Sequence, residues 1–516
     1  MKRRKPRLGL LLKFSATLIG AWVCLHLISH LNPPEGQIPS LVMKETSETK
    51  LGEACEGLAR MHPGKSGVFL LTSGRDAFAA RALLADAAER SLDIQYYIWH
   101  DDLSGGLLFA AIRRAADRGV RVRLLLDDNN TSGLDGVLAE LAAHPNIQVR
   151  LFNPFKFRRW RILGYLADFS RLNRRMHNKS FTADNQATVI GGRNVGDEYF
   201  AATRGTAFVD LDVLAIGPVV HDVSRDFDRY WASRSSYPVE RLLPGRRSVK
   251  SADAAPTIRA AEARSYLKAI SELPIARDLI DRTLPFEWAP TRMVSADPAK
   301  GLGLAPDSSL LWSRLREIVG PPETEWGLIS PYFVPEKSGV EALTGLARHG
   351  VKVRVLTNSL AATDVTAVHA GYAKWRKALL RGGVELFEMK TNSTASSVKS
   401  HTFAGSSGSS LHAKTFSVDR SRLFIGSFNF DPRSARLNTE LGFVIDSPVV
   451  ANRFADSLAG SVPDHAYRVR LSDTGSLQWV EQIDGKEIIY DQEPHTRWWR
   501  RAAVAVLSWL PIDWLL

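Results

Sequence analysis

HNKSFTADNQATVIGGRN, at residues 177–194, has a counterpart later in the chain, HAKTFSVDRSRLFIGSFN at residues 412–429. Each stretch begins with a histidine, which is followed at the same intervals by a lysine, an aspartate, a glycine and an asparagine. One short pattern of this kind is weak evidence, because residue frequencies alone produce it in an occasional chain. Two copies with the same extension make coincidence a negligible explanation. The chain therefore contains one fold unit twice.

A longer repeat surrounds the two copies. Residues 92–130 read as a β-rich run, a helical stretch and a second β-rich run, and residues 326–360 repeat that order. Within them, RGVRVRLL at residues 118–125 aligns with HGVKVRVL at residues 349–356. Such near-continuous apolar strands are typical of sheets covered by helices. We expect an α/β fold of two similar halves, each with a mixed or parallel sheet flanked by helices.

Length and composition fit a folded body of several domains. The chain has 516 residues, of which 45% are hydrophobic and 24% charged, and these values exclude a largely disordered, collagen-like or many-span membrane protein. Its two cysteines, Cys24 and Cys55, are too few for a disulfide framework or a cysteine-rich zinc site. We expect five segments: an N-terminal membrane segment at 1–30, a linker at 31–66, a first half at 67–285, a second half at 286–465 and a Trp-rich C-terminal segment at 466–516.

The N-terminus predicts attachment to a membrane. The formal net charge is +12, and about half of that excess lies within residues 1–13. An apolar run at residues 8–29 is long enough to span a bilayer. A retained anchor is favoured over a cleaved signal peptide, because no convincing small-x-small cleavage site is present. The positive-inside rule would then keep the N-terminus cytoplasmic and send the body outside, whereas an interfacial segment would leave the body in the cytoplasm.

Two other stretches combine cationic and aromatic residues, as membrane interfaces do. RWWRR at residues 497–501 begins a C-terminal amphipathic segment, which either contacts lipid headgroups or packs its tryptophans into the core. A second cluster comes shortly before the first motif and consists of FKFRRWR at residues 155–161 with Arg171, Arg174 and Arg175. We favour binding of lipid phosphates by this second cluster over a merely solvated basic face.

One stretch of the second half predicts a loop. Residues 391–410 are roughly two-thirds serine, threonine and glycine, a composition typical of irregular surface segments. The stretch leads directly into the motif at His412. It is interpreted either as a loop that closes over substrate or as a surface insertion without function, and the sequence favours neither.

The residue types in the two motifs suit cleavage of a phosphodiester. This reaction needs a nucleophile at phosphorus, an acid for the departing alcohol and positive charge near the nonbridging oxygens. Histidine and lysine two residues apart on a strand point to the same face, so each pair reaches one ligand. No metal or cofactor is required. The expected catalytic residues are His177, Lys179, Asp184, His412, Lys414 and Asp419, and the expected substrate-binding residues are Asn194 and Asn429.

A carboxylate follows each motif. DLDVLAIGPVV at residues 210–220 aligns with ELGFVIDSPVV at residues 440–450, which matches Asp210 with Glu440. A carboxylate that accepts a hydrogen bond from one ring nitrogen of a histidine holds the other nitrogen toward the substrate. We expect Asp210 and Glu440 to support the two motif histidines in this way. An ordinary salt bridge at a strand end is the alternative.

With these motifs the chain resembles the phospholipase D superfamily, whose mark is a duplicated His-x-Lys-x4-Asp pattern followed by glycine and asparagine. From about residue 57 to residue 516 it is also similar to the cardiolipin synthase C group of bacteria. That likeness rests on LDIQYYIWHDDLSG, RLNRRMHNKSFT, AGYAKWRKALLRGGVELFE, FIGSFNFDPRSARLNTELGFVI and LPIDWLL. It implies a duplicated phospholipase D fold with the active site between the halves, in a protein of the bacterial inner membrane.

The resemblance further implies phosphatidyl transfer between two phospholipids through a covalent phosphohistidine, with cardiolipin and a small alcohol as products. The first histidine of such proteins is commonly the nucleophile, so His177 would attack and His412 would serve as acid and then as base. Phosphatidylglycerol is the implied acceptor, and phosphatidylethanolamine or phosphatidylglycerol is the implied donor. The implied partners are phospholipid substrates and a membrane surface, with no nucleic acid and no identified protein.

Two other activities fit the same residues. Water that attacks the phosphohistidine would give phosphatidic acid, which is the reaction of a plain phospholipase D. A nuclease of the same superfamily is favoured by the positive charge and by the basic aromatic cluster at residues 155–161. The apolar N-terminus and the Trp-rich C-terminus argue against the nuclease.

Overall fold

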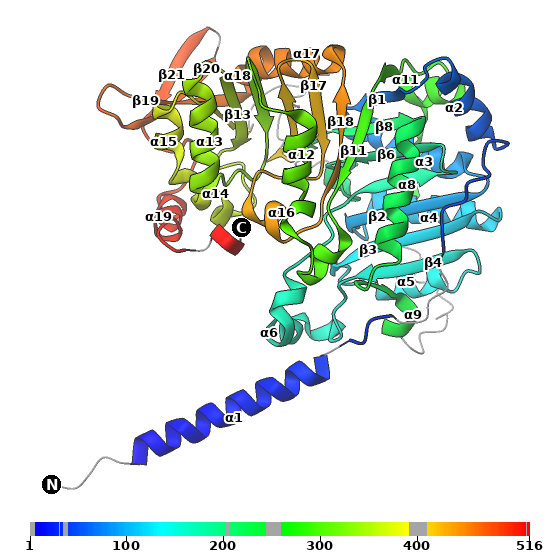
Figure 1. The fold of residues 1–516 in the computed structure, drawn as a ribbon, viewed down its shortest axis with the longest axis horizontal. Helices are drawn as coiled ribbons and strands as arrows, with labels where there is room; N and C mark the ends of the chain where they lie inside the picture. The colour runs from blue at the N-terminus through cyan, green and yellow to red at the C-terminus, as the bar shows by residue number, and fades with distance from the viewer. Residues whose placement is uncertain are drawn as a thin grey trace.

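The protein is described by a computed structural model that covers residues 6–29, 31–34, 40–202, 207–243, 260–391, 410–483, 485–511 and 513–515. Figure 1 shows two α/β halves side by side, with one long helix extending away from the body. This arrangement confirms the expected duplicated α/β fold. Most of the stretch expected to form a loop rich in serine, threonine and glycine, residues 392–409, lies outside the described residues.

The first half is built on a mixed nine-stranded sheet with the order β10-β1-β8-β6-β5-β2-β3-β4-β9. The central strands β2, β3 and β4 pair in parallel, and the flanking pairs are antiparallel. The strands are β1 (Ser66–Leu71), β2 (Ser91–Ile98), β3 (Arg121–Asn130), β4 (Ile147–Phe152), β5 (Ser180–Ala183), β6 (Ala187–Gly191), β8 (Asp212–Ile216), β9 (Ser236–Pro238) and β10 (Glu287–Ala289).

Helices pack against this sheet, and several of them begin at residues that favour a helix N-terminus. Ser73 caps the start of α3, and Asp102 caps α4 by accepting from the Gly105 N–H at 2.9 Å. Pro218 opens α8 at a position where a missing N–H costs nothing. The helices are α2 (Lys50–Arg60), α3 (Gly74–Ala87), α4 (Leu103–Asp117), α5 (Asp135–Ala142), α6 (Arg161–Leu172), α7 (Asp197–Phe200), α8 (Pro218–Trp231), α9 (Val239–Leu242), α10 (Ala260–Ser271) and α11 (Pro274–Ile280).

The second half repeats this plan on a ten-stranded sheet with the order β11-β18-β17-β16-β12-β13-β14-β19-β20-β21. The run β18-β17-β16-β12-β13-β14 corresponds to β8-β6-β5-β2-β3-β4 of the first half. The strands are β11 (Thr291–Ser295), β12 (Glu325–Ile329), β13 (Lys352–Asn358), β14 (Glu385–Met389), β16 (Thr415–Val418), β17 (Arg422–Gly426), β18 (Leu441–Asp446), β19 (Ala466–Leu471), β20 (Leu477–Ile483) and β21 (Lys486–Tyr490). The helices are α12 (Leu311–Val319), α13 (Glu336–Arg348), α14 (Thr366–Ala373), α15 (Arg376–Arg381), α16 (Pro432–Arg436), α17 (Pro448–Asp456), α18 (Val462–His465) and α19 (Trp498–Leu507).

Three of the segment boundaries expected from the sequence differ in the structure. Strands β19–β21 extend the second sheet beyond residue 465, because β19 pairs with the edge of β14 and occupies backbone groups that would otherwise stay open. Strand β10 pairs with β1, so the first half runs past residue 285. Helix α2 lies within the expected linker at 31–66.

The two sheets are joined closely. Strand β10 ends at Ala289 and β11 begins at Thr291, so Pro290 alone separates the two halves along the chain. One hydrophobic cluster contains buried side chains from both sheets, among them Val213 of the first and Ile425 of the second. The halves therefore form one continuously packed unit.

Both ends of the chain carry exposed apolar side chains. In the described part of the chain, α1 (Pro6–Ser29) is the one helix long and apolar enough to cross a membrane, and its span from residue 12 onward is almost entirely exposed. Helix α19 docks on α14 through the buried Val504. The tryptophans at its two ends do not fill a core, because Trp498 and Trp499 in its first turn and Trp509 just after it are 74%, 51% and 90% exposed.

The aspartate of each motif lies in a tight hairpin turn. Asp184 and Asp419 each have a positive φ, and so does the residue that follows each of them. Left-handed backbone at both central residues is what type I′ hairpin turns require, and aspartate tolerates it. The Asp184 carboxylate accepts from the backbone N–H groups of residues 89, 90 and 91 at 3.0, 2.8 and 2.8 Å. Asp419 accepts from residues 323, 324 and 325 in the same way.

These contacts predict a structural role for the two aspartates. Replacing Asp184 with Ala removes the acceptor of three backbone N–H groups, of which that of Ser91 is buried, and should lower the free energy of unfolding by about 2 kcal/mol. Urea unfolding followed by circular dichroism measures this loss. Asp184→Asn is the matched control, because it keeps one acceptor oxygen and tolerates the turn, and it should lose less. An unchanged urea midpoint for Asp184→Ala would contradict the structural role.

Candidate active site

The backbone of each motif histidine is hydrogen-bonded to the opposite half. The His177 N–H donates to the Thr439 carbonyl at 2.9 Å, so the segment before β5 is tied to the segment before β18. The His412 N–H donates to the Val209 carbonyl at 2.8 Å, where β7 (Phe208–Val209) pairs in parallel with β15 (Ser410–Leu411). Each histidine therefore lies beside the backbone of the opposite half.

This crossing brings each histidine to a carboxylate of the other half. Nδ1 of His177 lies 2.8 Å from Oε2 of Glu440, and Nδ1 of His412 lies 2.5 Å from Oδ2 of Asp210. An ionised carboxylate only accepts, so each Nδ1–H donates and each Nε2 keeps its lone pair. The expected carboxylates do contact the histidines, but every pair joins one half to the other.

Burial sets the protonation of both histidines. Their side chains are 8% and 13% exposed, respectively. Burial lowers the pKa of His177 to about 4, against the opposing attraction of Glu440, and it also lowers the pKa of His412. Burial alone would raise the pKa of Glu440, but the nearby His177 and Lys179 outweigh it and hold that pKa below its usual value. Neutral histidines thus stand beside ionised carboxylates.

Two buried lysines complete the polar centre. Nζ of Lys179 donates to the His177 carbonyl at 2.6 Å, and Nζ of Lys414 lies 3.2 Å from Nε2 of His412. Burial lowers the pKa of both lysines, and that of Lys414 falls to about 8. Each lysine also lowers the pKa of the histidine in the other half, so all four groups share one electrostatic site. An anionic ligand would relieve this cost of burying positive charge.

The two asparagines of the motifs are placed differently from each other. Oδ1 of Asn194 accepts from the Ile98 N–H at 3.2 Å, and its amide donates to the Tyr199 hydroxyl at 3.0 Å. Asn194 therefore braces the end of β2. Oδ1 of Asn429 is buried and has no hydrogen-bond partner among the described residues, which leaves it available to a ligand.

The structure does not bring Asp184 and Asp419 to the histidines. Both follow the far ends of the strands that begin beside His177 and His412, and both carboxylates are occupied by backbone N–H groups. The expectation of a catalytic role therefore does not fit their positions. Their identical spacing within the two motifs reflects the hairpin turn.

Aromatic rings line both histidines, and the sequence reasoning missed them. Tyr97 meets His177 edge-on with ring centroids 4.9 Å apart, and Tyr199 meets His412 edge-on at 5.2 Å. Phe208 stacks on His412 at 5.3 Å. These rings fix the imidazole planes and displace water from the site. The sequence did not single them out, because a tyrosine such as Tyr97 is an ordinary residue of a β-strand.

One further difference between the motifs has a structural reason. Ser427 occupies the position that Gly192 holds in the first copy. The Ser427 hydroxyl donates to Glu440. A side chain at Gly192 would collide with Asp210, because a Cβ there would lie 2.1 Å from its Oδ1. Each position is thus fitted to the carboxylate that it faces.

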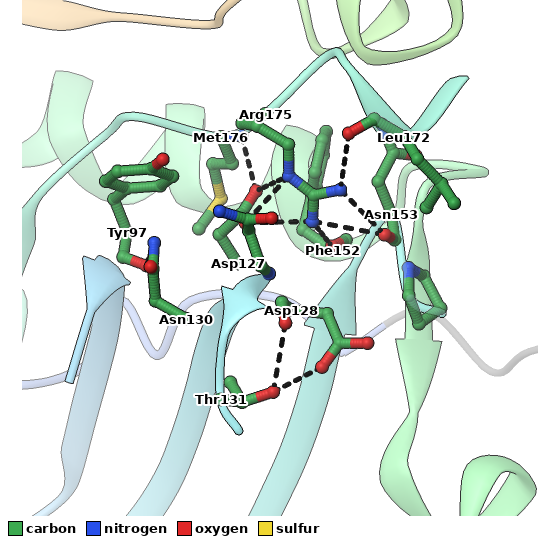
Figure 2. Close-up of polar contacts among 12 residues, drawn as sticks. Tyr97, Asp127, Asp128, Asn130, Thr131, Phe152, Asn153, Leu172, Arg175 and Met176 are labelled. Carbon is green, nitrogen blue, oxygen red and sulfur yellow. Dashed lines mark hydrogen bonds and ion pairs between the residues drawn. The ribbon is translucent and has the colours of Figure 1, made fainter. Parts of the chain in front are cut away.

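An ion pair between Arg175 and Asp127 holds the segment that leads into the first motif (Figure 2). Nε of Arg175 lies 2.9 Å from Oδ1 of Asp127, and the Met176 N–H donates to the other oxygen at 2.7 Å. Arg158 and Arg161 are likewise occupied by the carboxylate and the backbone carbonyl of Asp128. The interpretation of this basic cluster as a binding site for lipid phosphates is therefore wrong for these three arginines, whose charges are used internally.

Comparisons with known proteins agree with this geometry. The family described as "Cardiolipin synthase, PLD-like domain" matches residues 82–231 and 321–460, one match in each half. Cardiolipin synthase C of Escherichia coli (strain K12) is 53% identical over 475 residues, covering 90% of this chain and 100% of that protein. Cardiolipin synthase A of Pseudomonas entomophila (strain L48) is 26% identical over 419 residues, covering 81% and 72% of the two chains.

A solved structure supports the fold at greater distance. The phosphatidylserine synthase of Haemophilus influenzae Rd KW20 superposes with a TM-score of 0.54 at 12% identity, covering 91% of this chain and 100% of that one. At this identity the likeness concerns the fold alone. The two family matches and the 53% identity across 90% of the chain show that the protein belongs to the cardiolipin synthase family with duplicated phospholipase D-like domains.

Proposed function

We propose that this protein is a phosphatidyltransferase that makes cardiolipin from two phospholipids through a phosphohistidine. The observation that carries the proposal is the crossed pairing of His177 with Glu440 and His412 with Asp210. It places two imidazoles in one buried centre, each held through Nδ1 by a carboxylate so that Nε2 is left for the reaction. The similarity to cardiolipin synthase C of Escherichia coli supports cardiolipin as the product.

In the first step, Nε2 of His177 attacks the phosphorus of the donor lipid. The bond from phosphorus to the headgroup oxygen breaks, and that oxygen takes a proton from Nε2 of His412. His412 enters this step as the imidazolium, which the bound phosphodiester anion and Asp210 favour, and it leaves the step neutral. The products are a phosphatidyl group on His177 and a free small alcohol. Glu440 stabilises the positive charge that forms on the His177 ring, because it accepts the Nδ1 hydrogen bond.

In the second step, a glycerol hydroxyl of phosphatidylglycerol attacks the phosphohistidine. Neutral His412 removes its proton, the bond from phosphorus to Nε2 breaks, and His177 is released with cardiolipin. Lys179 and Lys414 offset the negative charge on the nonbridging oxygens in both steps. Asp210 holds the ring of His412 while it alternates between acid and base.

The donor and the place of reaction belong to the same proposal. Phosphatidylethanolamine or phosphatidylglycerol serves as donor, and helix α1 attaches the enzyme to the bacterial inner membrane. Hydrolysis to phosphatidic acid is the competing outcome of the same intermediate, because water needs only to replace the lipid hydroxyl. The aromatic lining of both histidines favours transfer, since it limits water at the phosphorus.

A donor lipid with a good leaving group distinguishes the nucleophilic histidine from the histidine that acts as acid. With phosphatidyl-p-nitrophenol the first step needs no acid, so His412→Ala should release one equivalent of nitrophenol in a burst and then stall. His177→Ala should give no burst. With natural lipids both variants should lose about 10³-fold or more in rate, because each step needs both residues. Stopped-flow absorbance measures the burst.

Two controls accompany these variants. Unchanged circular dichroism and thermal midpoints confirm that each variant is folded. A mixture of the two variants should stay inactive, because both histidines serve one site within one chain. A burst from His177→Ala with none from His412→Ala would reverse the assignment, and recovery in the mixture would indicate that sites are shared between chains.

The lowered pKa of His177 sets the acid side of the pH profile. An imidazole with a pKa of about 4 is protonated only below that pH, so its Nε2 stays nucleophilic at higher pH. In the His412→Ala variant the burst rate should therefore stay level from pH 8 to about pH 5 and fall toward pH 4. A midpoint near the ordinary histidine value would contradict the buried, neutral state of His177.

The product ratio distinguishes transfer from hydrolysis. Labelled phosphatidylglycerol in mixed vesicles should appear mainly in cardiolipin and less in phosphatidic acid, because the site orients a lipid hydroxyl and limits water. Added phosphatidylethanolamine should raise the yield if it serves as donor. Thin-layer chromatography separates the products. Predominant phosphatidic acid would make the enzyme a phospholipase D, and cleavage of DNA without a lipid product would indicate a nuclease.

A further inference from the structure

Helix α6 exposes apolar side chains, whereas a helix on the surface of a soluble protein exposes mainly polar ones. Ile162 and Leu166, one turn apart on the same side, are 76% and 61% exposed, and Trp160 just before the helix is 65% exposed. Arg158 and Arg161 point inward instead, where they bond to the carboxylate and the backbone carbonyl of Asp128, whereas Arg159 is exposed. An apolar edge of this kind, facing outward, suits a nonaqueous partner.

The N-terminal helix lies directly against this edge. Nε1 of Trp22 donates to the Leu166 carbonyl at 3.0 Å, and Nδ1 of His26 lies 2.8 Å from the Ala167 carbonyl. These contacts fall within the stretch of α1 that is apolar enough to cross a membrane. If residues 12–29 enter a bilayer, α6 must meet that bilayer at the level of Trp22 and His26.

The end of α6 is connected to the C-terminal residues of the chain. Arg433 of α16 donates to the Asn173 carbonyl, at the end of α6, at 3.0 Å and to the Leu515 carbonyl at 2.9 Å. The exposed tryptophans of α19 precede that end of the chain, and Figure 1 shows α1 and α6 at the bottom of the molecule and α19 at the left, below the second half. Arg433 thus links the end of α6 to the end of the chain.

We propose that the exposed edge of α6, made by Trp160, Ile162, Leu166 and Phe169, is a second membrane-contact element that inserts into the headgroup and acyl boundary beside α1. The occupant of this edge is the phospholipid bilayer. The argument is continuity with α1, together with the inward pairing of Arg158 and Arg161, whose charges would otherwise resist insertion. Tryptophan at the start of such a helix suits the interfacial layer.

This contact would bring the bilayer to the active site. Helix α6 ends at Leu172, and His177 follows after one short segment that Asp127 and Arg175 hold rigid. A lipid leaving the leaflet beside α6 would therefore have a short path to the phosphorus position. This use of the edge rests on the proposed function, whereas the insertion itself does not.

The native cysteines allow a direct test of insertion in the full-length protein. Cys24 is exposed on α1, and Cys55 is buried with its pKa raised to about 12 by that burial, so it resists labelling. A fluorescent probe is attached either to Cys24 in the native chain or to the thiol introduced at position 162 by Cys24→Ala/Ile162→Cys. The protein is then placed in phosphatidylglycerol and phosphatidylethanolamine vesicles that contain nitroxide-labelled acyl chains.

The expected result is similar quenching of both probes by the acyl-chain nitroxides. A third probe, from Cys24→Ala/Ile280→Cys, is the matched control, because Ile280 is 68% exposed at the end of α11 on the other side of the first half. Its quenching should be several-fold weaker. Quenching at position 162 should persist in about 0.5 M salt, because insertion of apolar side chains is not an electrostatic adsorption.

Two outcomes would overturn the proposal. The first is quenching at position 162 no stronger than at position 280 while the Cys24 probe is quenched, which would leave α6 in water. The second is a probe at position 162 that is shielded in a concentration-dependent way without vesicles, which would identify a second copy of the chain as the occupant. Neither outcome depends on catalysis, so failure here is distinct from failure of the proposed function.

Charge placed on the edge tests its use by the enzyme. Ile162→Glu/Leu166→Glu should lower cardiolipin formation on vesicles by about 10-fold, because a carboxylate is costly among acyl chains. The loss on dispersed short-chain lipids should be much smaller. Ile280→Glu should match the native enzyme on both substrates. Equal losses on the two substrates for the double variant would mean that the edge stabilises the fold rather than contacting the membrane.

Discussion

The hydrogen bond from each motif histidine to a carboxylate of the opposite half is the constraint on which the rest of the structure depends. His177 is hydrogen-bonded to Glu440, and His412 is hydrogen-bonded to Asp210. Neither half holds a complete pair, so each sheet must present its strand ends to the other at a fixed distance. The single residue between β10 and β11 and the hydrophobic cluster shared by both sheets meet that requirement.

The same pairing explains how a buried site holds so many ionisable groups. Two carboxylates, two lysines and two histidines lie together with little water, and each isolated charge would be costly there. Burial keeps the histidines neutral, and the lysines balance the carboxylates. The carboxylates are hydrogen-bonded to the histidines, so the negative charge of a bound phosphodiester would lie beside the two lysines and stabilise their charged form.

The sequence predicted the fold class, the duplication and the two histidines, because the motif spacing repeats at every position that the fold unit needs. It also matched Asp210 with Glu440. It did not reveal that each carboxylate serves the other half, since an internal alignment pairs equivalent residues and carries no information about contacts between copies. Asp184 was misread for a related reason, because a turn that needs a carboxylate repeats as faithfully as a catalytic residue does. The inward pairing of Arg175 with Asp127 was hidden because the two residues are 48 positions apart in the sequence.

The close connection between the sheets has a stereochemical consequence. Because Pro290 alone joins β10 to β11 and the core is continuous, the two histidines are held at fixed positions relative to each other. In the proposed mechanism, His177 approaches phosphorus from one side, whereas the headgroup oxygen leaves and the acceptor oxygen arrives on the side of His412. Each in-line displacement inverts the phosphorus centre, so two of them in succession return it to its original handedness. A donor made chiral at phosphorus would pass that handedness unchanged to the product.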